Sequence, residues 1–316
     1  MAQGTMGHRI SVVIPARDRQ ATIGAAIRSV QAQTLPAHEI LVVDDASRDR
    51  TAEVVETMAR SDPRIRCRRL EAPSGAPTAR NAGAAEAIGS FLAFLDSDDL
   101  WHPDKLRLQM RVLEAEPRTE AVGCHFVKMG AGGVPVLVMA PRPRVGLADL
   151  VAYNLVGPTS ILCVRREAFE AVGGFDPLMP SCQDWELLSR LAARADIRNV
   201  QAVLVEQGVS ADNRITRDAR RVVDGHRAIH ARTRALARER GLARRWVHAR
   251  QAPAEVEVLL RHGMLWPAAR LTARAPYPRS LAKWVRALAP RGARMRRADG
   301  LGEAAREDST QRSPVG

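Results

Sequence analysis

The stretch FLAFLDSDDLWHPDKL, from Phe91 to Leu106, joins a run of bulky apolar residues to a dense group of carboxylates. Its first five residues are typical of a buried strand, and three aspartates, Asp96, Asp98 and Asp99, follow at once. In an open parallel α/β sheet, ligands bind in the crevice at the carboxyl ends of the strands. The stretch therefore predicts one strand of such a sheet and a charged crevice where that strand ends.

Similar apolar runs alternate with helical patterns on both sides of this stretch, from Ile10 to about Glu206. We expect strands over 10–16, 39–47, 65–72 and 91–95, and helices over 21–33, 77–89 and 103–116, with another helix around Val54. Pro103 suits the first turn of its helix, and Asp99 is expected to cap that helix. Near-continuous apolar strands alternating with helices predict an α/β fold, with a mostly parallel, Rossmann-like sheet covered by helices on both faces.

The alternation becomes less regular after Ala121. Two apolar runs, 121–129 and 134–140, are compatible with a hairpin, and 160–169 is expected to form a strand followed by a short helix. An amphipathic helix is predicted over 183–195. Beyond Ser210 the chain has helical patterns, most clearly over 226–250 and 280–289.

The composition, 46% hydrophobic and 26% charged, is that of a globular protein with a substantial core. An aromatic content of 4% and the lack of a recognisable reading motif weigh against a nucleic-acid partner. The four cysteines form no CxxC pair, so neither a zinc site nor a disulfide framework is indicated. Because the sequence holds neither a signal pattern nor a long apolar run, we expect a cytoplasmic protein.

The net charge of +13 is concentrated in the last third of the chain. Between Arg214 and Arg297 there are 22 Lys or Arg residues, and the rest of the chain is close to neutral. This basic region could face an anionic partner, such as phospholipid head groups, or form a solvated helical surface.

Two groups of carboxylates are expected to meet at one edge of the sheet. Asp44 and Asp45 end the second strand, whereas Asp96, Asp98 and Asp99 end the fourth. These side chains would repel one another unless a cation or hydrogen-bond donors compensated their charge. Mg²⁺ or Mn²⁺ bridging substrate phosphates fits such a site, because these ions accept one or two carboxylates plus phosphate oxygens. The other interpretation is that the aspartates begin loops and cap the next helix.

Four segments, in this order, carry a resemblance to a known family: VVIPARDR, LVVDDASRDRT, PTARNAGAAEAIGSFLAFLDSDDLW and GGFDP followed by QDWEL. Together they resemble family 2 glycosyltransferases of the GT-A fold, from about Ile10 to Gln207. The resemblance implies a metal-dependent, inverting enzyme. Such an enzyme moves a sugar from a nucleoside diphosphate, UDP being the expected one, to an acceptor hydroxyl.

The resemblance also implies donor-binding roles. Pro15 and Ala16 would lie beside the nucleotide. Either Asp44 or Asp45 would accept a hydrogen bond from the base or ribose, and we favour Asp44. Arg80 would lie near the diphosphate, where its planar fork of donors suits phosphate oxygens. The next residue, Asn81, would brace the loop.

The resemblance also implies a metal site and a catalytic base. The resemblance implies that Asp98 binds Mn²⁺ or Mg²⁺ directly and that Asp96 reaches the ribose or a metal-bound water. It implies that Asp184, in QDWEL, is the general base that takes the proton of the acceptor hydroxyl. The GGFDP turn is expected to shape the acceptor side, and Trp101 and Trp185 are expected either to line the sugar pocket or to pack in the core.

The sequence departs from the family pattern at three places. Arg17 and Asp18 replace a common Tyr-Asn, and Gln183 replaces a Glu before the base. The segment VLVEQGVS, 203–210, replaces a Tyr-Arg-x-His segment, so Arg214 or Arg217 is the expected substitute for its phosphate contact.

These patterns predict the following division: a flexible N-terminus over 1–9, a GT-A glycosyltransferase domain over 10–210, a basic helical region over 211–297 and a disordered tail over 298–316. The acceptor is expected to be a cell-surface glycan, a lipid-linked sugar or a natural product. The basic helices offer peripheral contact with the inner membrane face. A non-catalytic nucleotide- or anion-binding module on the same fold is the alternative hypothesis.

Overall fold

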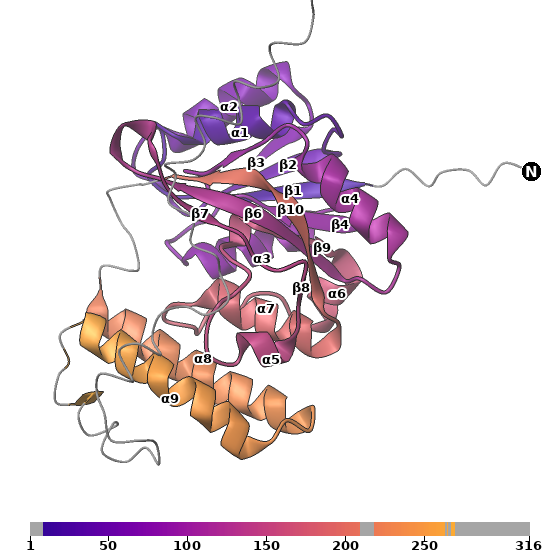
Figure 1. Cartoon of the computed structure of the whole chain (residues 1–316). Helices are drawn as coiled ribbons and strands as arrows, with labels where there is room; N and C mark the ends of the chain where they lie inside the picture. Colours follow the sequence, from indigo (N-terminus) through magenta and orange to yellow (C-terminus); the bar gives the residue numbers. More distant parts are fainter. Residues whose placement is uncertain (1–8, 209–217, 263, 265–266, 269–316) are drawn as a thin grey trace, which may run out of the picture.

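The computed structural model describes residues 9–208, 218–262, 264 and 267–268. A ten-stranded sheet lies at its centre (Figure 1). One half of this sheet is parallel, because β1 pairs with both β2 and β4, and β2 pairs with β3. These strands are β1 (Ile10–Ala16), β2 (Glu39–Asp44), β3 (Ile65–Arg69) and β4 (Phe91–Phe94). They match the four strands expected from the sequence.

The other half of the sheet is mixed. β6 runs parallel to β10, whereas β9, β5, β7 and β8 each pair antiparallel with their neighbours. These strands are β5 (Leu100–Trp101), β6 (Ala121–Met129), β7 (Pro135–Met139), β8 (Arg144–Val145), β9 (Cys163–Arg165) and β10 (Ile197–Gln207). The α/β class is confirmed, and the expected hairpin is formed by β6 and β7.

Helices cover both faces of the sheet (Figure 1). α1 and α2 lie on one face, and α3 and α7 lie on the other. The helices of this part are α1 (Ile23–Gln31), α2 (Thr51–Ser61), α3 (Ala76–Glu86), α4 (Lys105–Ala115), α5 (Leu147–Leu150), α6 (Arg166–Ala171) and α7 (Gln183–Arg194). The small residues of α3 have a packing reason, since a Cβ at Gly83 would lie 2.5 Å from Val13 on β1.

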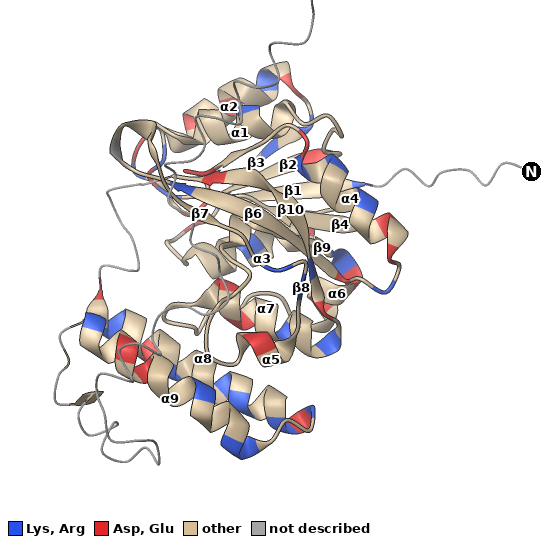
Figure 2. Cartoon of the chain, viewed as in Figure 1, with Lys and Arg blue, Asp and Glu red and all other residues tan. Residues whose placement is uncertain are grey.

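Two further helices form a hairpin that packs on α7 and α5. They are α8 (Ala219–Glu239) and α9 (Arg244–Arg261). The helical pattern expected over 226–250 is interrupted, because Gly241 adopts a φ of 73° and closes α8. Gly225 lets α8 approach the segment before α7, since a Cβ there would lie 1.9 Å from the Ser181 hydroxyl. Figure 2 shows the many Lys and Arg residues of this hairpin.

The start of α4 differs from the expectation. The helix begins at Lys105 with Asp104 at its N-cap, so Pro103 precedes it. Asp99 does not cap this helix, because β5 intervenes. The Asp99 carboxylate instead accepts hydrogen bonds from the Ser160 hydroxyl (2.5 Å) and the Gly208 N–H (2.9 Å).

No helix in the described part of the chain combines the length and apolar character of a membrane-spanning segment. The expected helix over 280–289, the N-terminal segment 1–8, the tail 298–316, and Arg214 and Arg217 lie outside the described residues.

Candidate active site

A cavity of about 430 Å³ lies where β1, β2 and β4 end. Pro15 and Ala16, at the end of β1, form part of its wall, as expected from the sequence. Charged side chains of both signs line much of the rest: Arg17, Arg19, Arg80, Arg221, Asp45, Asp96 and Asp98. Four guanidinium groups beside three carboxylates suit an anion that brings a cation with it.

Of the two aspartates that follow β2, Asp45 is the one that lines this cavity. Its carboxylate accepts hydrogen bonds from the N–H groups of Ser74 (2.6 Å) and Gly75 (2.9 Å), at the N-terminus of α3. Asp44 is fully buried and lies outside the cavity wall, where it accepts from Ser47 N–H (3.1 Å) and lies 3.4 Å from Arg69. Consecutive residues of an extended segment point in opposite directions, which separates the two carboxylates.

Arg80 projects from α3 into the same cavity. Its guanidinium donates to the Asp96 carboxylate over 2.5 Å and lies 5.2 Å from the ring centre of Phe175. The side chain is buried, and its Nε–H has no hydrogen-bond partner within the part of the chain that the structure describes. A buried, unsatisfied donor beside a cavity is a group that a bound anion can satisfy.

Negative charge accumulates where β4 ends. Burial raises the pKa of the Asp99 carboxyl well above its usual range, and the neighbouring charges of Asp96 and Asp98 raise it further. Among the described residues, no group of three or more His, Cys, Asp or Glu side chains is arranged as a complete metal site. Asp96 and Asp98 do fit a cation that takes its remaining ligands from substrate phosphates and water.

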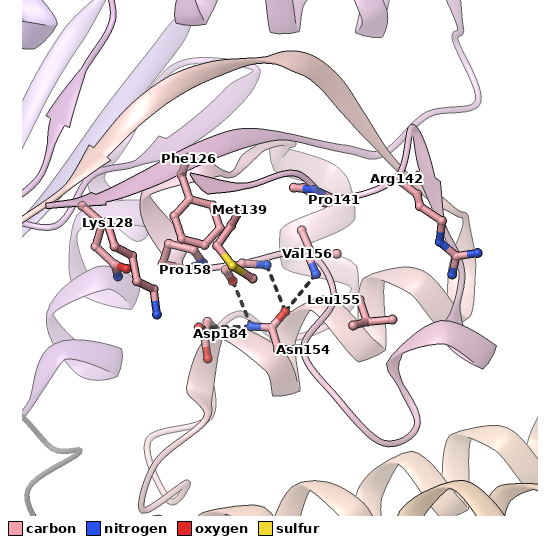
Figure 3. Close-up of a pocket in the computed structure, with 12 residues that line it drawn as sticks. Phe126, Lys128, Met139, Pro141, Arg142, Asn154, Leu155, Val156, Pro158 and Asp184 are labelled. Atoms are coloured by element: carbon pink, nitrogen blue, oxygen red, sulfur yellow. Dashed lines mark hydrogen bonds between the residues drawn. The ribbon is translucent and has the colours of Figure 1, made fainter. Parts of the chain in front are cut away.

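A second cavity, of about 230 Å³, contains Asp184 in its wall (Figure 3). Most of its other residues are apolar: Phe126, Met139, Pro141, Leu155, Val156, Gly157 and Pro158. Lys128, Arg142, Asn154 and Gln207 add polar groups. An apolar wall with one carboxylate and a few other polar groups is typical of a site for an organic hydroxyl compound.

Asp184 lies in the first turn of α7, as the sequence predicts. Its carboxylate accepts hydrogen bonds from the Trp185 N–H (2.8 Å) and from the amide of Asn154 (3.3 Å). Burial raises the pKa of this carboxyl, while the Trp185 N–H and the charge of Arg80 lower it, and Asp96 raises it. Because charges from the first cavity act on Asp184, the two cavities are neighbours.

The GGFDP turn supports Arg80 and lies outside the walls of both cavities. Asn81 donates to the Phe175 carbonyl (2.7 Å) and accepts from the Phe175 N–H (2.9 Å), so it braces this turn, as expected. The turn therefore holds the Phe175 ring against Arg80. Its expected role on the acceptor side stays a prediction.

Trp101 and Trp185 are core residues. Both side chains are buried, and their indole N–H groups donate to the carbonyls of Ser160 (2.9 Å) and Leu150 (2.7 Å). Neither tryptophan lines either cavity.

Among the site residues that the sequence-based predictions missed, two matter most for the arguments below. Arg221, from the first turn of α8, lines the charged cavity, and Asn154, from the loop after α5, contacts Asp184. Neither lies in a motif, so only the folded chain brings them to the site.

Solved structures of glycosyltransferases share this fold. S. aureus TarS 1–349 in complex with UDP-GlcNAc aligns with a TM-score of 0.60 and 17% identity over 80% of each chain. A mannosyltransferase from Pyrobaculum calidifontis in complex with GDP-Man and Mn²⁺ aligns with a TM-score of 0.55 and 21% identity, over 84% of this chain and 78% of that one. The fold is thus that of GT-A glycosyltransferases.

Sequence comparison then gives the family. The family model described as glycosyl transferase family 2 matches residues 11–173, more than half of the chain, and the chain belongs to this family. A putative teichuronic acid biosynthesis glycosyltransferase of Bacillus subtilis, TuaG, is 38% identical over 159 residues, which are 50% of this chain and 63% of the relative.

A second curated relative comes from Escherichia coli. The UDP-Glc:alpha-D-GlcNAc-diphosphoundecaprenol beta-1,3-glucosyltransferase WfgD is 40% identical over 104 residues, which are 33% of this chain and 40% of the relative. This chain thus spans less than two thirds of the length of each of these two curated relatives.

Proposed function

We propose that the chain is a metal-dependent, inverting glycosyltransferase that moves a sugar from a UDP-sugar to an acceptor hydroxyl. The observation that carries this proposal is the position of Asp184 in the wall of a mainly apolar cavity beside a second cavity rich in guanidinium groups. The charged cavity suits a nucleoside diphosphate, and the apolar one suits the acceptor. A carboxylate in the wall of the apolar cavity can take the acceptor's proton as the hydroxyl attacks the sugar.

Donor binding is assigned to residues of the charged cavity. Asp45 accepts a hydrogen bond from the base or ribose, beside Pro15 and Ala16. Arg80 and Arg221 offer N–H groups to the diphosphate. Asp98 and Asp96 would hold Mn²⁺ or Mg²⁺, which when bound offsets the negative charge of the leaving nucleoside diphosphate.

Asp184 is assigned to the base because its environment suits proton transfer. Burial raises the pKa of Asp184, which makes its ionised carboxylate a stronger base than that of an exposed aspartate. The apolar walls around it keep water from competing with the acceptor hydroxyl. Attack from the side opposite the leaving diphosphate gives inversion at the anomeric carbon.

We further propose a lipid-linked acceptor, which a peripheral membrane contact would bring close. The WfgD relative is named for a diphosphoundecaprenol-linked substrate. In this chain, exposed arginines gather around the turn between α8 and α9: Arg238, Arg240, Arg244 and Arg245. Trp246 is exposed beside them, with Arg250 over its ring at 4.9 Å. Basic residues with an interfacial tryptophan suit anionic lipid head groups.

Donor chemistry is tested by incubating the full chain with UDP-, GDP- and dTDP-sugars, with Mn²⁺, Mg²⁺ or EDTA, and measuring nucleoside diphosphate release and thermal stability. We expect a UDP-sugar to stabilise the chain and to be turned over only with metal. Binding without any turnover would favour the non-catalytic module instead.

Membrane contact is tested by sedimentation with vesicles of phosphatidylcholine alone or with phosphatidylglycerol. We expect binding to the anionic vesicles only, weakened by salt and by the double change Arg244→Glu, Arg245→Glu. Equal binding of the parent chain and the double variant would show that the turn between α8 and α9 takes no part in the membrane contact.

A further inference from the structure

The polar contacts around Asp184 continue into the C-terminal helical hairpin. The geometry points to Asn154 as a positioning residue for the proposed base, with the α8–α9 hairpin holding the loop that carries it. This inference rests on the proposed function of Asp184. It assigns a role in the reaction to a part of the chain that lies beyond the match to the family model.

The side chain of Asn154 is fixed by four contacts (Figure 3). Its Oδ1 accepts from the N–H groups of Val156 (3.2 Å) and Gly157 (3.0 Å), and its Nδ2 donates to the Gly157 carbonyl (2.9 Å). Two backbone donors require an oxygen at Oδ1, so the amide cannot be flipped. The remaining N–H is therefore directed at Asp184, with Nδ2 and Oδ2 3.3 Å apart.

This contact restrains the Asp184 carboxylate from outside its own helix. The Trp185 N–H holds one oxygen and Asn154 holds the other. With both oxygens anchored, their remaining lone pairs are kept in a fixed direction in the wall of the apolar cavity. A base held in one orientation avoids the entropy loss of finding it during the reaction.

The loop that carries Asn154 is tied to the hairpin by buried side chains. Gln251 of α9 donates to the Val151 carbonyl (2.8 Å), and Thr233 of α8 donates to the same oxygen (3.3 Å). His230 Nε2 lies 3.3 Å from the Ala152 carbonyl oxygen. All three side chains are at most 1% exposed.

These ties explain why polar side chains are buried in the hairpin. Gln251 Nε2 also lies within hydrogen-bond distance of the Thr233 hydroxyl (2.9 Å) and the His230 carbonyl (3.1 Å), so the side chains of Gln251 and Thr233 and the backbone of His230 form one network. Buried polar groups destabilise a fold unless each finds a partner, and here several of the partners are carbonyls of the loop. The hairpin, the loop, Asn154 and Asp184 thus form one connected series of contacts.

The test compares two substitutions of Asn154 in the full chain. When ionised, the new side chain of Asn154→Asp keeps an oxygen for the Val156 and Gly157 N–H groups but cannot donate to Asp184, whereas Asn154→Ala removes both functions. We expect both to lower the kcat of UDP release from UDP-glucose with Mn²⁺ by about 10- to 100-fold. UDP affinity should remain within about twofold, because Asn154 and Asp184 both lie outside the wall of the charged cavity.

The pH dependence separates positioning from a merely structural role. Loss of a hydrogen bond to the ionised carboxylate raises the pKa of Asp184, and a new negative charge in Asn154→Asp raises it further. The acid limb of kcat should therefore move to higher pH, and further for Asn154→Asp than for Asn154→Ala. An unmoved acid limb with parent-like kcat in Asn154→Asp would overturn the inference.

Gln251→Ala tests the role of the hairpin. It should lower kcat in the parent chain, yet lower it little further in the Asn154→Ala background, because both changes act through one loop. Arg227→Ala is the matched control on the same hairpin, since it removes only an exposed ion pair with Asp224. Equal effects of Gln251→Ala in both backgrounds would exclude action through Asn154.

A measurement that needs no turnover keeps this inference separate from the proposed function. The titration of Asp184 is followed by ¹³C NMR in the parent chain and in Asn154→Asp, with Asp184→Asn used to assign the signal. We expect the signal to titrate at higher pH in Asn154→Asp, whether or not the chain transfers sugar. If the parent is inactive but this shift occurs, the proposed function fails alone, and if the parent is active without the shift, the positioning role fails alone.

Discussion

The two cavities are built in different ways. The charged cavity takes most of its residues from strand ends, from the segments just after strands and from α3, all in the first hundred residues; they include Pro15, Ala16, Asp45, Arg80, Asp96 and Asp98. The cavity that contains Asp184 draws on β6, β7, the loop after α5 and α7. The proposed donor cavity thus depends on local geometry at strand ends, whereas the position of the proposed base depends on contacts between distant segments.

The largest effect is expected from Asp184→Asn, which keeps the shape of the side chain but removes the base. Turnover of UDP-glucose should fall by about 100- to 10,000-fold, the usual contribution of a general base. UDP affinity, measured by calorimetry with Mn²⁺, should remain unchanged. Undiminished turnover would show that Asp184 is not the base. A parallel loss of UDP affinity would show that the two cavities do not have separate roles.

The next prediction concerns pH. The base acts only when ionised, and burial raises the pKa of Asp184 above that of an ordinary aspartate. Turnover should therefore fall about tenfold per pH unit below that raised pKa, at a higher pH than for an exposed carboxyl of pKa about 3.9. The kcat is measured from pH 4 to 8, with folding followed by circular dichroism. An acid limb at the ordinary aspartate pKa would contradict the buried environment.

Asp98→Ala tests the charged cavity of this pair. Removal of a carboxylate that would hold the metal should weaken Mn²⁺-dependent UDP binding by about tenfold, or roughly 1.4 kcal/mol. Binding measured in EDTA should change much less. Asp224→Ala, which removes an exposed aspartate of α8, is the control. Equal UDP affinity of parent and Asp98→Ala with Mn²⁺ would exclude Asp98 as a metal ligand.

The smallest effect is expected from Arg221→Ala. The Arg221 side chain is exposed, and exposed charge pairs contribute up to about 1 kcal/mol, so UDP affinity should fall by about two- to fivefold. The loss should shrink at high salt. An affinity that stays unchanged at low salt would show that α8 contributes nothing to donor binding.

The sequence was sufficient for the parts of the molecule in which local pattern decides structure. β1 to β4 are near-continuous apolar runs, and charged residues stand at their ends, so the strands and several residues of the charged cavity could be predicted. Which of Asp44 and Asp45 lines this cavity could not be predicted, because it depends on which side chain turns toward Ser74 and Gly75.

The residues that could not be predicted act across long stretches of chain. Asn154 reaches Asp184 only because the loop after α5 is held by α8 and α9, and no local pattern encodes such a contact. Asp99 was expected to cap α4, but a two-residue strand, β5, separates the two. The break at Gly241 is the exception, because a glycine inside a helical pattern is a local signal for a helix end.

The brace between Asn81 and Phe175 spans 94 residues, and it has a consequence for the order in which the site is assembled during synthesis. When the ribosome has made β1 to β4, all the strands of the donor side exist, but Arg80 still lacks the Phe175 ring beside it. The cavity also lacks Arg221 until α8 has emerged. A nascent chain that stops before α8 would therefore contain every donor-side motif and still present an unfinished donor cavity.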